Sequence, residues 1–517
     1  MAAPPANDHP PASLAVWLGF AVMCLGMFMA VLDVQVVATS LPTIQGALNI
    51  APDQMSWVQT AYLTAEVISI PLTGLLTRIL TLRWLFVIAL TLFTAASIGC
   101  AASGGFSALI GWRIAQGFSG GVLIPSVFAA VFLQFSARSQ PMATTIAGVV
   151  ALLAPTLGPV VGGWITQTFS WRWLFLINVT PGVICALGAL RLLPKAPTDL
   201  EQARRIDVAS LSLMAVALAA LEIGLKAAPH HGWLSPPCLT PLAVFGVCGA
   251  GFVVRSLRVL RPIVDLRALT DRNFAVGCLL NFVLGAGLFG SIYLMPVFLF
   301  FVRGHNALEI GEIMLVTGVA QLVVAPVAIA LERRVDARWL CAAGFAAFAL
   351  GLALSGFQTE NTDFAAMLWP QVIRGVAMMF CLLPPTRLAL GRLAAHKVAD
   401  ASGLFNLTRN LGGAIGLALV DTVIYGRSAT HVAAIAMRLK AGDVATAQAV
   451  GIPTHLFLAQ IGEPIDSATQ AMLRPMVERL ALTWAINEAW IMLAVLTLIA
   501  LISLPWVKTG GPDRSSQ

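Results

Sequence analysis

The sequence predicts an all-α integral membrane protein with fourteen transmembrane helices. Of its 517 residues, 58% are hydrophobic and only 11% are charged, and the mean hydropathy is +0.86. Soluble domains contain about 45–50% apolar and about 25% charged residues, because the surface of a globule must be largely polar. Fourteen apolar stretches provide the ~20 residues that cross a ~30 Å hydrocarbon core. An outer-membrane barrel is disfavoured, because no ten-residue stretches of alternating polarity are present.

The predicted helices fall into a group of six, a pair, and a second group of six. The first group is expected at 15–39, 54–76, 84–103, 106–133, 142–167 and 172–193. The pair is expected at 208–226 and 238–257. The second group is expected at 273–300, 309–331, 338–356, 364–386, 400–424 and 482–507. The corresponding domains are a disordered tail (1–13), a six-helix bundle (14–193), the two extra helices with their loops (194–272), a second bundle (273–508) and a tail (509–517).

The basic residues predict that both termini lie in the cytoplasm. With the N-terminus inside, 20 of the 31 Lys and Arg residues fall in cytoplasmic loops and three in short outer loops. Five more lie in a long outer segment, 425–481, and long segments are exempt from the positive-inside rule. These loops account for the net charge of +7, so no nucleic-acid partner is expected. The segment 425–481 is the best candidate for the contact surface of a soluble partner.

The sequence contains none of the patterns that would indicate an enzyme or an ATP-driven pump. The eight cysteines form no CxxC pair, which argues against a metal site or a disulfide framework. No GxxxxGK(S/T) signature for nucleotide binding is present. Clustered His or Cys ligands, or a nucleophile in register with a base, are also absent from the sequence. Energy from an ion gradient, without a cofactor, is therefore expected.

Asp33 and Arg113 are charged residues at matching depth in the first and fourth predicted helices. Each lies about seven residues from the outer end of its helix, or roughly 10 Å at 1.5 Å per residue. A charge at that depth is costly unless it is paired or hydrated. The two residues form either a static structural pair or a pair that separates, so that proton uptake by Asp33 follows the conformation. We favour the second interpretation.

Four more acidic residues lie within or near predicted helices. Glu66 is at the middle of the second helix and has no basic residue within one turn. It is either a neutral, hydrogen-bonded acid, a proton carrier, or a carboxylate that recognises cationic substrates. Glu222 and Lys226 are spaced for an i,i+4 pair near the outer surface. Asp421 and Glu488 are candidates for the outer mouth or for secondary proton sites.

The fifth predicted helix contains a cluster of small and kink-forming residues: Pro155, Gly158, Pro159, Gly162 and Gly163. Glycines four residues apart allow a neighbouring helix to approach closely, and proline removes a backbone hydrogen bond and kinks the helix. Plain helix packing would explain the cluster. The alternative is a pliable interface that changes between conformational states.

Four ordered stretches together resemble one family of transporters. They are LDVQVVATSLP (32–42), RIAQGFSGG (113–121), APTLGPVVGG (154–163) and WRWLFLINV (171–179). They resemble signatures of the major facilitator superfamily and, within it, of the fourteen-helix drug:proton antiporters of the EmrB/QacA type. The stretches PIVDL (262–266), NLTRN (406–410) and NE (487–488) are similar to EmrB-like exporters too. The resemblance therefore covers about residues 15–508.

The resemblance implies a proton-coupled multidrug efflux antiporter of the bacterial inner membrane. It would export hydrophobic or amphipathic compounds, which are expected to be cationic, by alternating access between two pseudo-repeated six-helix bundles. Proton coupling would fall on Asp33, Glu66 and Arg113, and the cluster on the fifth helix would be the antiporter motif. The candidates for the substrate cavity are Gln35, Tyr62, Gln116, Arg409 and Glu488. A periplasmic adaptor and an outer-membrane channel would be partners in a host with two membranes.

The chain departs from this family at its expected cytoplasmic gate and at Gln35. The loop after the second helix reads GLLTRILTLR (74–83), with Arg78 where the family has an acid and without the central glycine. The gating candidates are therefore Arg78 and Arg83 and, after the tenth helix, Asp336 and Arg338. Gln35 stands where the family usually has Thr. Because the gate is altered, a protein that no longer transports and acts as a sensor remains a further alternative.

Two other kinds of transporter remain as alternatives. An exporter of one endogenous metabolite, such as a siderophore, a fatty acid or an amino acid, would have the same sequence features. An uptake symporter is disfavoured by the motif on the fifth helix.

Overall fold

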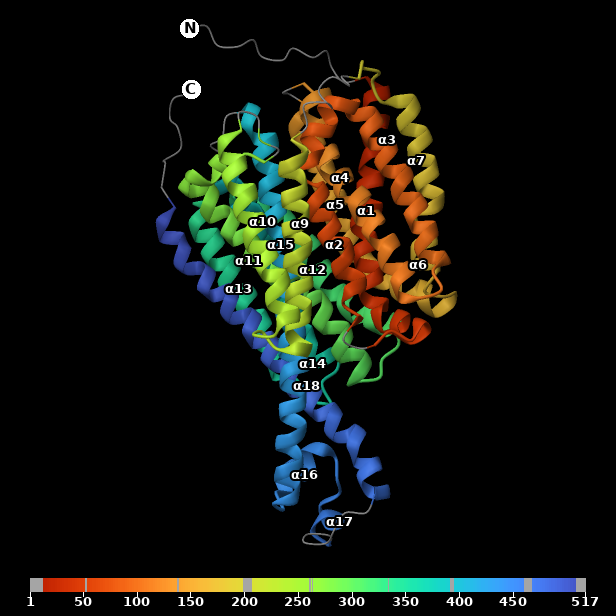
Figure 1. Cartoon of the computed structure of the whole chain (residues 1–517), viewed down its shortest axis with the longest axis vertical. Coiled ribbons are helices and arrows are strands. Elements are labelled where there is room, and N and C mark those ends of the chain that lie inside the picture. The colour runs from red at the N-terminus through yellow and green to blue at the C-terminus, as the bar shows by residue number, and fades with distance from the viewer. Residues whose placement is uncertain are drawn as a thin grey trace.

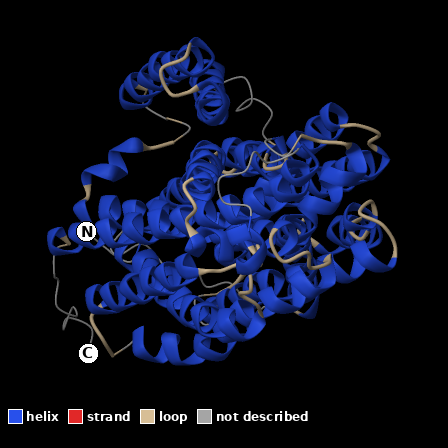
Figure 2. Ribbon diagram, turned by 90° about the horizontal axis from the view of Figure 1, so that it is seen from below, coloured by secondary structure: helices blue, strands red, loops and turns tan. Residues whose placement is uncertain are grey.

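In the computed structural model, the described part of the chain consists of helices joined by turns and short loops. The described residues are 13–51, 54–136, 139–198, 207–259, 262, 264–332, 334–390, 395–459 and 467–507. Figure 2, in which helices are blue, shows no strand among them. Apart from Ser13, the two tails predicted at 1–13 and 509–517 lie outside the described residues.

The helices occur in the order expected from the apolar stretches. The N-terminal group comprises α1 (Leu14–Leu48), α2 (Trp57–Ser69), α3 (Leu72–Ala102), α4 (Phe106–Gln134), α5 (Gln140–Thr168), α6 (Trp173–Leu176) and α7 (Val179–Leu192). The extra pair is α9 (Val208–His231) and α10 (Pro236–Arg258). The C-terminal group comprises α11 (Arg272–Phe301), α12 (Ala307–Glu332), α13 (Ala337–Leu354), α14 (Phe364–Leu390), α15 (Ala395–Lys440), α16 (Val444–Val450), α17 (Thr454–Ala459) and α18 (Ser467–Ala500). Short 3-10 helices are η2 (Leu266–Thr270), η3 (Ser355–Phe357) and η4 (Leu501–Trp506).

Thirteen helices in the described part of the chain are long and apolar enough to cross a membrane. The difference from the predicted fourteen arises in the second span. α2 ends before Pro71 and is too short to be counted. α3 then continues from Leu72 and is broken at Thr81, whose φ of 69° and ψ of 158° are not helical. The part of α3 before Thr81 completes the second predicted span, and the part after it is the third. The all-α membrane fold is therefore confirmed.

The two groups repeat the same packing scheme. α1 packs on α4, α5 and α7, and α11, the first helix of the second group, packs on α14, α15 and α18. α5 and α12 cross between the groups, and α9 contacts both α2 and α15. In Figure 1 the red-to-orange N-terminal helices and most of the green-to-blue C-terminal helices lie on opposite sides, with α9 and α10 in front of their junction.

An arm formed by residues 425–459 and 467–481 projects from one end of the bundle (Figure 1). α15 has 46 residues, or about 69 Å of helix at 1.5 Å per residue, which exceeds the ~30 Å hydrocarbon core. α16 and α17 join α15 to α18, and the arm has a small core that includes Ile435, Val450 and Leu480. The spans predicted at 400–424 and 482–507 covered only the apolar parts of α15 and α18, because both helices continue through polar sequence into the arm.

Candidate functional site

A buried ion pair between Asp33 of α1 and Arg113 of α4 forms the centre of the N-terminal group. Both side chains are 0% exposed, and Arg113 Nη1 donates to Asp33 Oδ2. Arg113 Nε donates to the carbonyl oxygen of Val58 at 3.0 Å, and the guanidinium lies 4.4 Å from the centre of the Tyr62 ring. The acid and the base predicted to pair are thus in contact, and they join α1, α2 and α4.

The Asp33 carboxylate also accepts two amide donors. Gln116 Nε2 and Asn178 Nδ2 each donate to Asp33 Oδ1 at 2.8 Å. Gln116 also donates to Ser97 Oγ at 2.9 Å and accepts from Arg113 at 2.7 Å. A buried charge requires such full hydrogen bonding, because the interior does not replace the lost hydration. Neither Asn178 nor Ser97 is predicted as a site residue from the sequence, although Asn178 lies in the WRWLFLINV stretch.

The position of Asp33 along α1 differs from that expected, whereas the position of Arg113 along α4 agrees. α1 continues to Leu48 and ends at Asn49, whose left-handed conformation (φ 53°) is a common helix stop. Asp33 therefore lies 15 residues before the end of α1, whereas Arg113 lies seven residues after the start of α4. The expected seven residues between Asp33 and the outer end of its helix were wrong, because α1 extends past its apolar stretch, whereas the contact between the two side chains agrees with the predicted equal depth. Asp33 is near the middle of its helix.

Glu66 of α2 lies at the junction between the two groups. It is buried, and from the C-terminal group Asn410 and the Arg409 guanidinium of α15 interact with its carboxyl. Arg409 Nη2 donates to Asn406 Oδ1 at 3.0 Å. Glu66 has no basic residue within one turn of its own helix, but the fold brings Arg409 to it from 343 positions later in the chain. Glu66 and Arg409 therefore face each other across the two groups.

A second buried ion pair joins the extra helix α9 to the C-terminal group. Lys226 Nζ lies 2.6 Å from Asp421 Oδ2 of α15, and Ser56 donates to the same oxygen at 2.5 Å. Lys226 and Glu222, expected to pair near the outer surface, are each 4% exposed, and the ion pair that Lys226 forms is with Asp421 and not with Glu222. Their helix packs against α2 and α15, which buries that face. Lys226 therefore pairs with Asp421, which is itself buried rather than at an outer mouth.

The glycines of the α5 motif lie where helices approach most closely. A Cβ added at Gly158 would be 2.3 Å from Gln35 Cβ, and one at Gly162 would be 2.6 Å from the carbonyl oxygen of Val36. On the other side, a Cβ at Gly163 would be 2.2 Å from the carbonyl oxygen of Ala307. The motif therefore packs α5 against α1 and α12 at once. It connects the helix of Asp33 to the boundary between the groups.

The α12 side of this crossing is equally tight. A Cβ at Gly311 would be 2.3 Å from the carbonyl oxygen of Pro159, and one at Gly318 would be 2.6 Å from Thr156 Cα. Small residues on both helices thus bring the two groups into backbone contact.

A cavity of about 50 Å³ lies between the two groups, lined by residues of α1, α5, α11, α12 and α14. Gln35, Pro155 and Pro159 belong to its lining. Three methionines, including Met295 and Met314, also line it; such flexible side chains adapt to ligands of different shape. Binding sites for drug-sized ligands occupy about 300–1,000 Å³. The cavity must therefore enlarge before it admits such a compound.

Of the five predicted cavity residues, only Gln35 lines this cavity. Tyr62 and Gln116 belong to the surroundings of Asp33 and Arg113, and Arg409 faces Glu66. Glu488 is at the base of the arm, where it accepts from Arg427 Nε at 2.6 Å and lies 3.0 Å from His431 Nε2. The cavity also contains Arg374 and Gln371, which the sequence analysis did not select.

Two of the predicted gating residues, Arg83 and Asp336, make local contacts. Arg83 Nη2 donates to the carbonyl oxygen of Leu190 at 2.5 Å, within the N-terminal group. Asp336 accepts from the backbone amide of Arg338 at 2.9 Å and caps α13. Arg78 lies in α3 just before the break at Thr81. The contacts of Arg83 and Asp336 stabilise helix ends and do not join the two groups.

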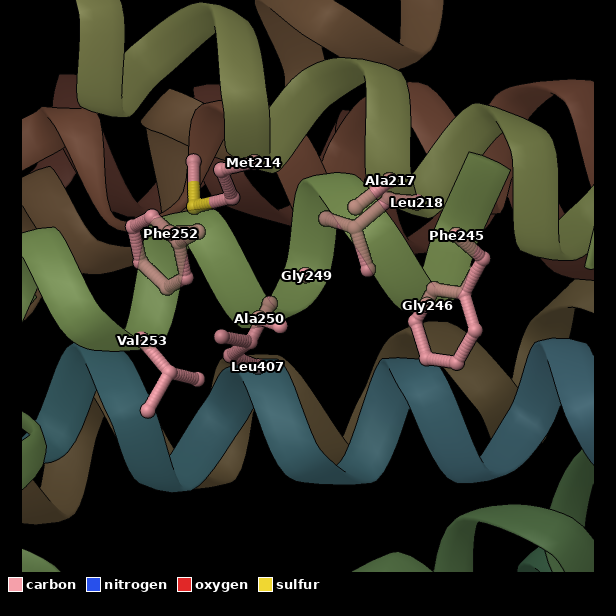
Figure 3. A pocket seen from close by; sticks show the side chains of 10 residues that line it. All are labelled: Met214, Ala217, Leu218, Phe245, Gly246, Gly249, Ala250, Phe252, Val253 and Leu407. Atoms are coloured by element: carbon pink, nitrogen blue, oxygen red, sulfur yellow. The ribbon is translucent and has the colours of Figure 1, made fainter. Parts of the chain in front are cut away.

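A larger hollow of about 280 Å³ lies between α9, α10 and Leu407 of α15. Figure 3 shows that its lining is apolar, with Met214, Phe245 and Phe252 among the larger side chains. It contains no group that could bind a proton or recognise a charge, so the coupling chemistry lies elsewhere.

Comparison with known proteins gives matches along most of the chain. The family model described as Major Facilitator Superfamily matches residues 23–417. The "Colistin resistance protein EmrB" of Acinetobacter baumannii is 37% identical over 428 residues, which cover 82% of this chain and 83% of that protein. The "Multidrug export protein EmrB" of Escherichia coli K12 is 33% identical, covering 79% and 80%. The "Fatty acid resistance protein FarB" of Neisseria gonorrhoeae is 30% identical, covering 82% and 84%.

Solved structures of transporters share the fold at low sequence identity. A bacterial homologue of the human lysosomal transporter Spinster, in an inward-facing and unoccupied conformation, has a TM-score of 0.59 at 14% identity and covers 96% of this chain and 98% of its own. A structure from a study of proton-dependent oligopeptide transporters has a TM-score of 0.61 at 14% identity, covering 95% and 99%. At such identities, the likeness concerns the arrangement of the helices alone.

Proposed function

The chain belongs to the major facilitator superfamily, and from this premise we propose that it is a proton-coupled exporter of hydrophobic and amphipathic compounds. As a member of that family it is a multi-pass membrane transporter and not an enzyme. The observation that carries the proposal is the buried pair of Asp33 and Arg113. Only Asp33 of the two can change its charge at physiological pH, because a guanidinium stays protonated.

Proton binding at Asp33 would be transmitted along α1 to the boundary between the groups. A protonated Asp33 loses the charge that attracts Arg113, which weakens the strongest contact between α1 and α4. Gln35 and Val36, two and three residues further along α1, pack on the glycines of α5. A shift of α1 therefore moves α5 against α12. In this mechanism the α5 motif couples protonation to the rocking of one group against the other.

Glu66 would act as a second proton-binding group. Its position opposite Arg409 and Asn410 means that its surroundings change whenever the two groups separate. A carboxyl that is paired in one state and unpaired in the other binds a proton differently in each. The proton motive force would supply the energy, and no cofactor is required in this mechanism.

Multidrug substrates are supported by the EmrB relatives and by the methionines of the cavity. Cationic substrates were expected from the sequence, but no described residue that lines the cavity is acidic. A second candidate function is export of one particular compound. The FarB relative, named for fatty acid resistance, favours a fatty acid among the metabolites considered. A substrate panel distinguishes the two candidates, since a multidrug exporter would respond to several unrelated compounds.

We further propose that the protein lies in a bacterial inner membrane with the start of α1 in the cytoplasm, as the distribution of basic residues indicates. The arm would then project into the periplasm. Exposed apolar side chains on it, including Met437, Leu456 and Leu458, would contact a periplasmic adaptor that leads to an outer-membrane channel.

The proposal is tested by proton release from inside-out vesicles with an acidic interior, read by a pH-sensitive dye. Ethidium, a permanent cation, and neutral hydrophobic compounds are suitable substrates, because they cannot carry protons across the membrane themselves. Substrate addition should collapse the gradient in wild-type vesicles but not in Asp33→Asn vesicles. Asp207→Asn is the matched control, since Asn also caps the start of α9, and it should behave as wild type. Failure of every compound in wild type would refute proton-coupled export.

A further inference from the structure

The cavity between the two groups contains a buried cation that is not matched by an acid. Arg374 of α14 lines the cavity and is 3% exposed. Within the described residues its guanidinium forms no ion pair or hydrogen bond, and Nε is buried without an acceptor. The Trp490 ring lies 4.6 Å from the guanidinium carbon. That contact covers one face of the guanidinium and leaves its N–H donors, which lie in its plane, without acceptors.

A second donor without an acceptor lies one turn away. Gln371 also lines the cavity; its Oε1 accepts from Thr317 at 3.1 Å, while its Nε2 is buried without a partner. Residues three positions apart on a helix lie on the same face. Arg374 and Gln371 therefore place two hydrogen-bond donors without acceptors on one face of α14.

The N-terminal group shows what a matched arginine looks like in this fold. Arg113 of α4 has Asp33, Gln116 and the Val58 carbonyl as acceptors, and of its three nitrogens only Nη2 is buried without one. α4 and α14 occupy corresponding positions, since α4 packs on α1 and α14 packs on α11. α1 supplies Asp33, whereas α11 contains no Asp or Glu. The C-terminal group therefore lacks an acid equivalent to Asp33.

We propose that Arg374 and Gln371 form a binding subsite for the carboxylate of an amphipathic acid, whose apolar body lies against the cavity's methionines. A planar guanidinium binds a carboxylate through parallel hydrogen bonds, and an unpaired buried cation gains most from such a partner. The assignment rests on the proposed export function and reverses the substrate charge expected from the sequence. The ligand enters when the two groups move apart, because the present volume holds only a few water molecules.

Direct binding of three matched probes to the full chain in phosphatidylcholine nanodiscs tests this assignment. The probes are naphthaleneacetate, the neutral naphthaleneacetamide and the cationic naphthylmethylammonium, measured by titration calorimetry at neutral pH against empty nanodiscs. We expect wild type to bind the acid about tenfold more tightly than the amide, as charge-assisted hydrogen bonds are about twice as strong as neutral ones. The cation should bind most weakly.

Three variants distinguish the loss of the subsite from a general loss of folding. Arg374→Gln should remove the preference for the acid and leave amide binding unchanged, which also shows that the variant is folded. Gln371→Leu should reduce the preference without abolishing it, and it serves as the test if Arg374→Gln does not fold. Arg387→Gln is the matched control on the same helix, because Arg387 donates to the Glu332 carbonyl oxygen outside the cavity. It should retain the full preference.

Three results would overturn the assignment. They are equal or absent binding of acid and amide in wild type, a preference that survives Arg374→Gln, and loss of acid binding in phosphatidylglycerol nanodiscs. The last result would assign the donors to an anionic lipid headgroup instead. These measurements need no proton gradient. Failure of proton coupling would therefore appear only in the vesicle assay and would leave the binding preference intact.

Discussion

Gln35 of α1 packs directly against Gly158 of α5, with no room between them for even one added carbon: a Cβ at Gly158 would lie 2.3 Å from Gln35 Cβ. Gln35 follows Asp33 by two residues. The helix that contains the buried acid therefore touches the helix that forms the boundary between the two groups. This contact makes the α5 motif part of the proposed coupling route and not only a place of close packing.

Alanine at the motif should block transport. We expect Gly158→Ala to reduce substrate-driven proton movement at least about tenfold, because the new methyl group must displace α1 from α5. Gly148→Ala on the same helix is the control, since a Cβ there meets nothing within 4 Å. In a helix interior, alanine is favoured over glycine by about 0.8–1.0 kcal/mol. The Gly148→Ala control should therefore be active and no less stable than wild type. Equal activity of the two variants would contradict the coupling role of the motif.

The two single variants of the buried pair should differ in stability. Removing one partner of a buried ion pair costs about 3–5 kcal/mol because the other charge is left uncompensated. Asp33→Asn leaves a guanidinium that cannot lose its proton, whereas Arg113→Gln leaves a carboxyl that can gain one. Thermal unfolding in detergent should therefore show Asp33→Asn to be the less stable variant. The double variant should be more stable than Asp33→Asn alone. A double variant that is less stable than Asp33→Asn would show that the two residues do not act only on each other.

Glu66→Gln should lower the transport of all substrates by the same factor. Glu66 does not line the cavity and faces Arg409 and Asn410, so its loss affects the movement of the groups and not the recognition of a ligand. The measurement is the initial rate of export for a cationic, a neutral and an acidic compound. Selective loss of the cationic compound would instead make Glu66 a recognition carboxylate.

Lys226→Met should loosen the attachment of α9. It leaves the buried Asp421 carboxyl without its cation, while Ser56 still donates to it. We expect a loss of unfolding free energy that the added Asp421→Asn largely restores, because the second change removes the unmatched charge. A thermal unfolding series of the single and double variants measures this coupling. Additive losses would mean that Lys226 and Asp421 stabilise the fold independently.

The apolar lengths predict the helices because crossing a bilayer demands about 20 apolar residues, and only the divided second span departs from the expected count. Contacts between distant segments could not be predicted in this way. Lys226 has Glu222 one turn away yet pairs with Asp421, 195 positions later. The pairing of Asp33 with Arg113 was predictable because an intramembrane charge requires a partner. The unmatched state of Arg374 was not predictable, because an arginine within an apolar span is expected to be paired or to extend to the membrane surface, and its lack of a partner is visible only in three dimensions.

The central claim is that Asp33 couples export to the proton gradient. The most direct test measures steady-state accumulation of a neutral hydrophobic compound in inside-out proteoliposomes with an acidic interior, over a series of imposed pH differences. The account predicts that the accumulation ratio of wild type rises with the pH difference, while that of Asp33→Asn stays at the value set by passive equilibration. An Asp33→Asn variant whose accumulation follows the pH gradient as steeply as wild type would contradict it.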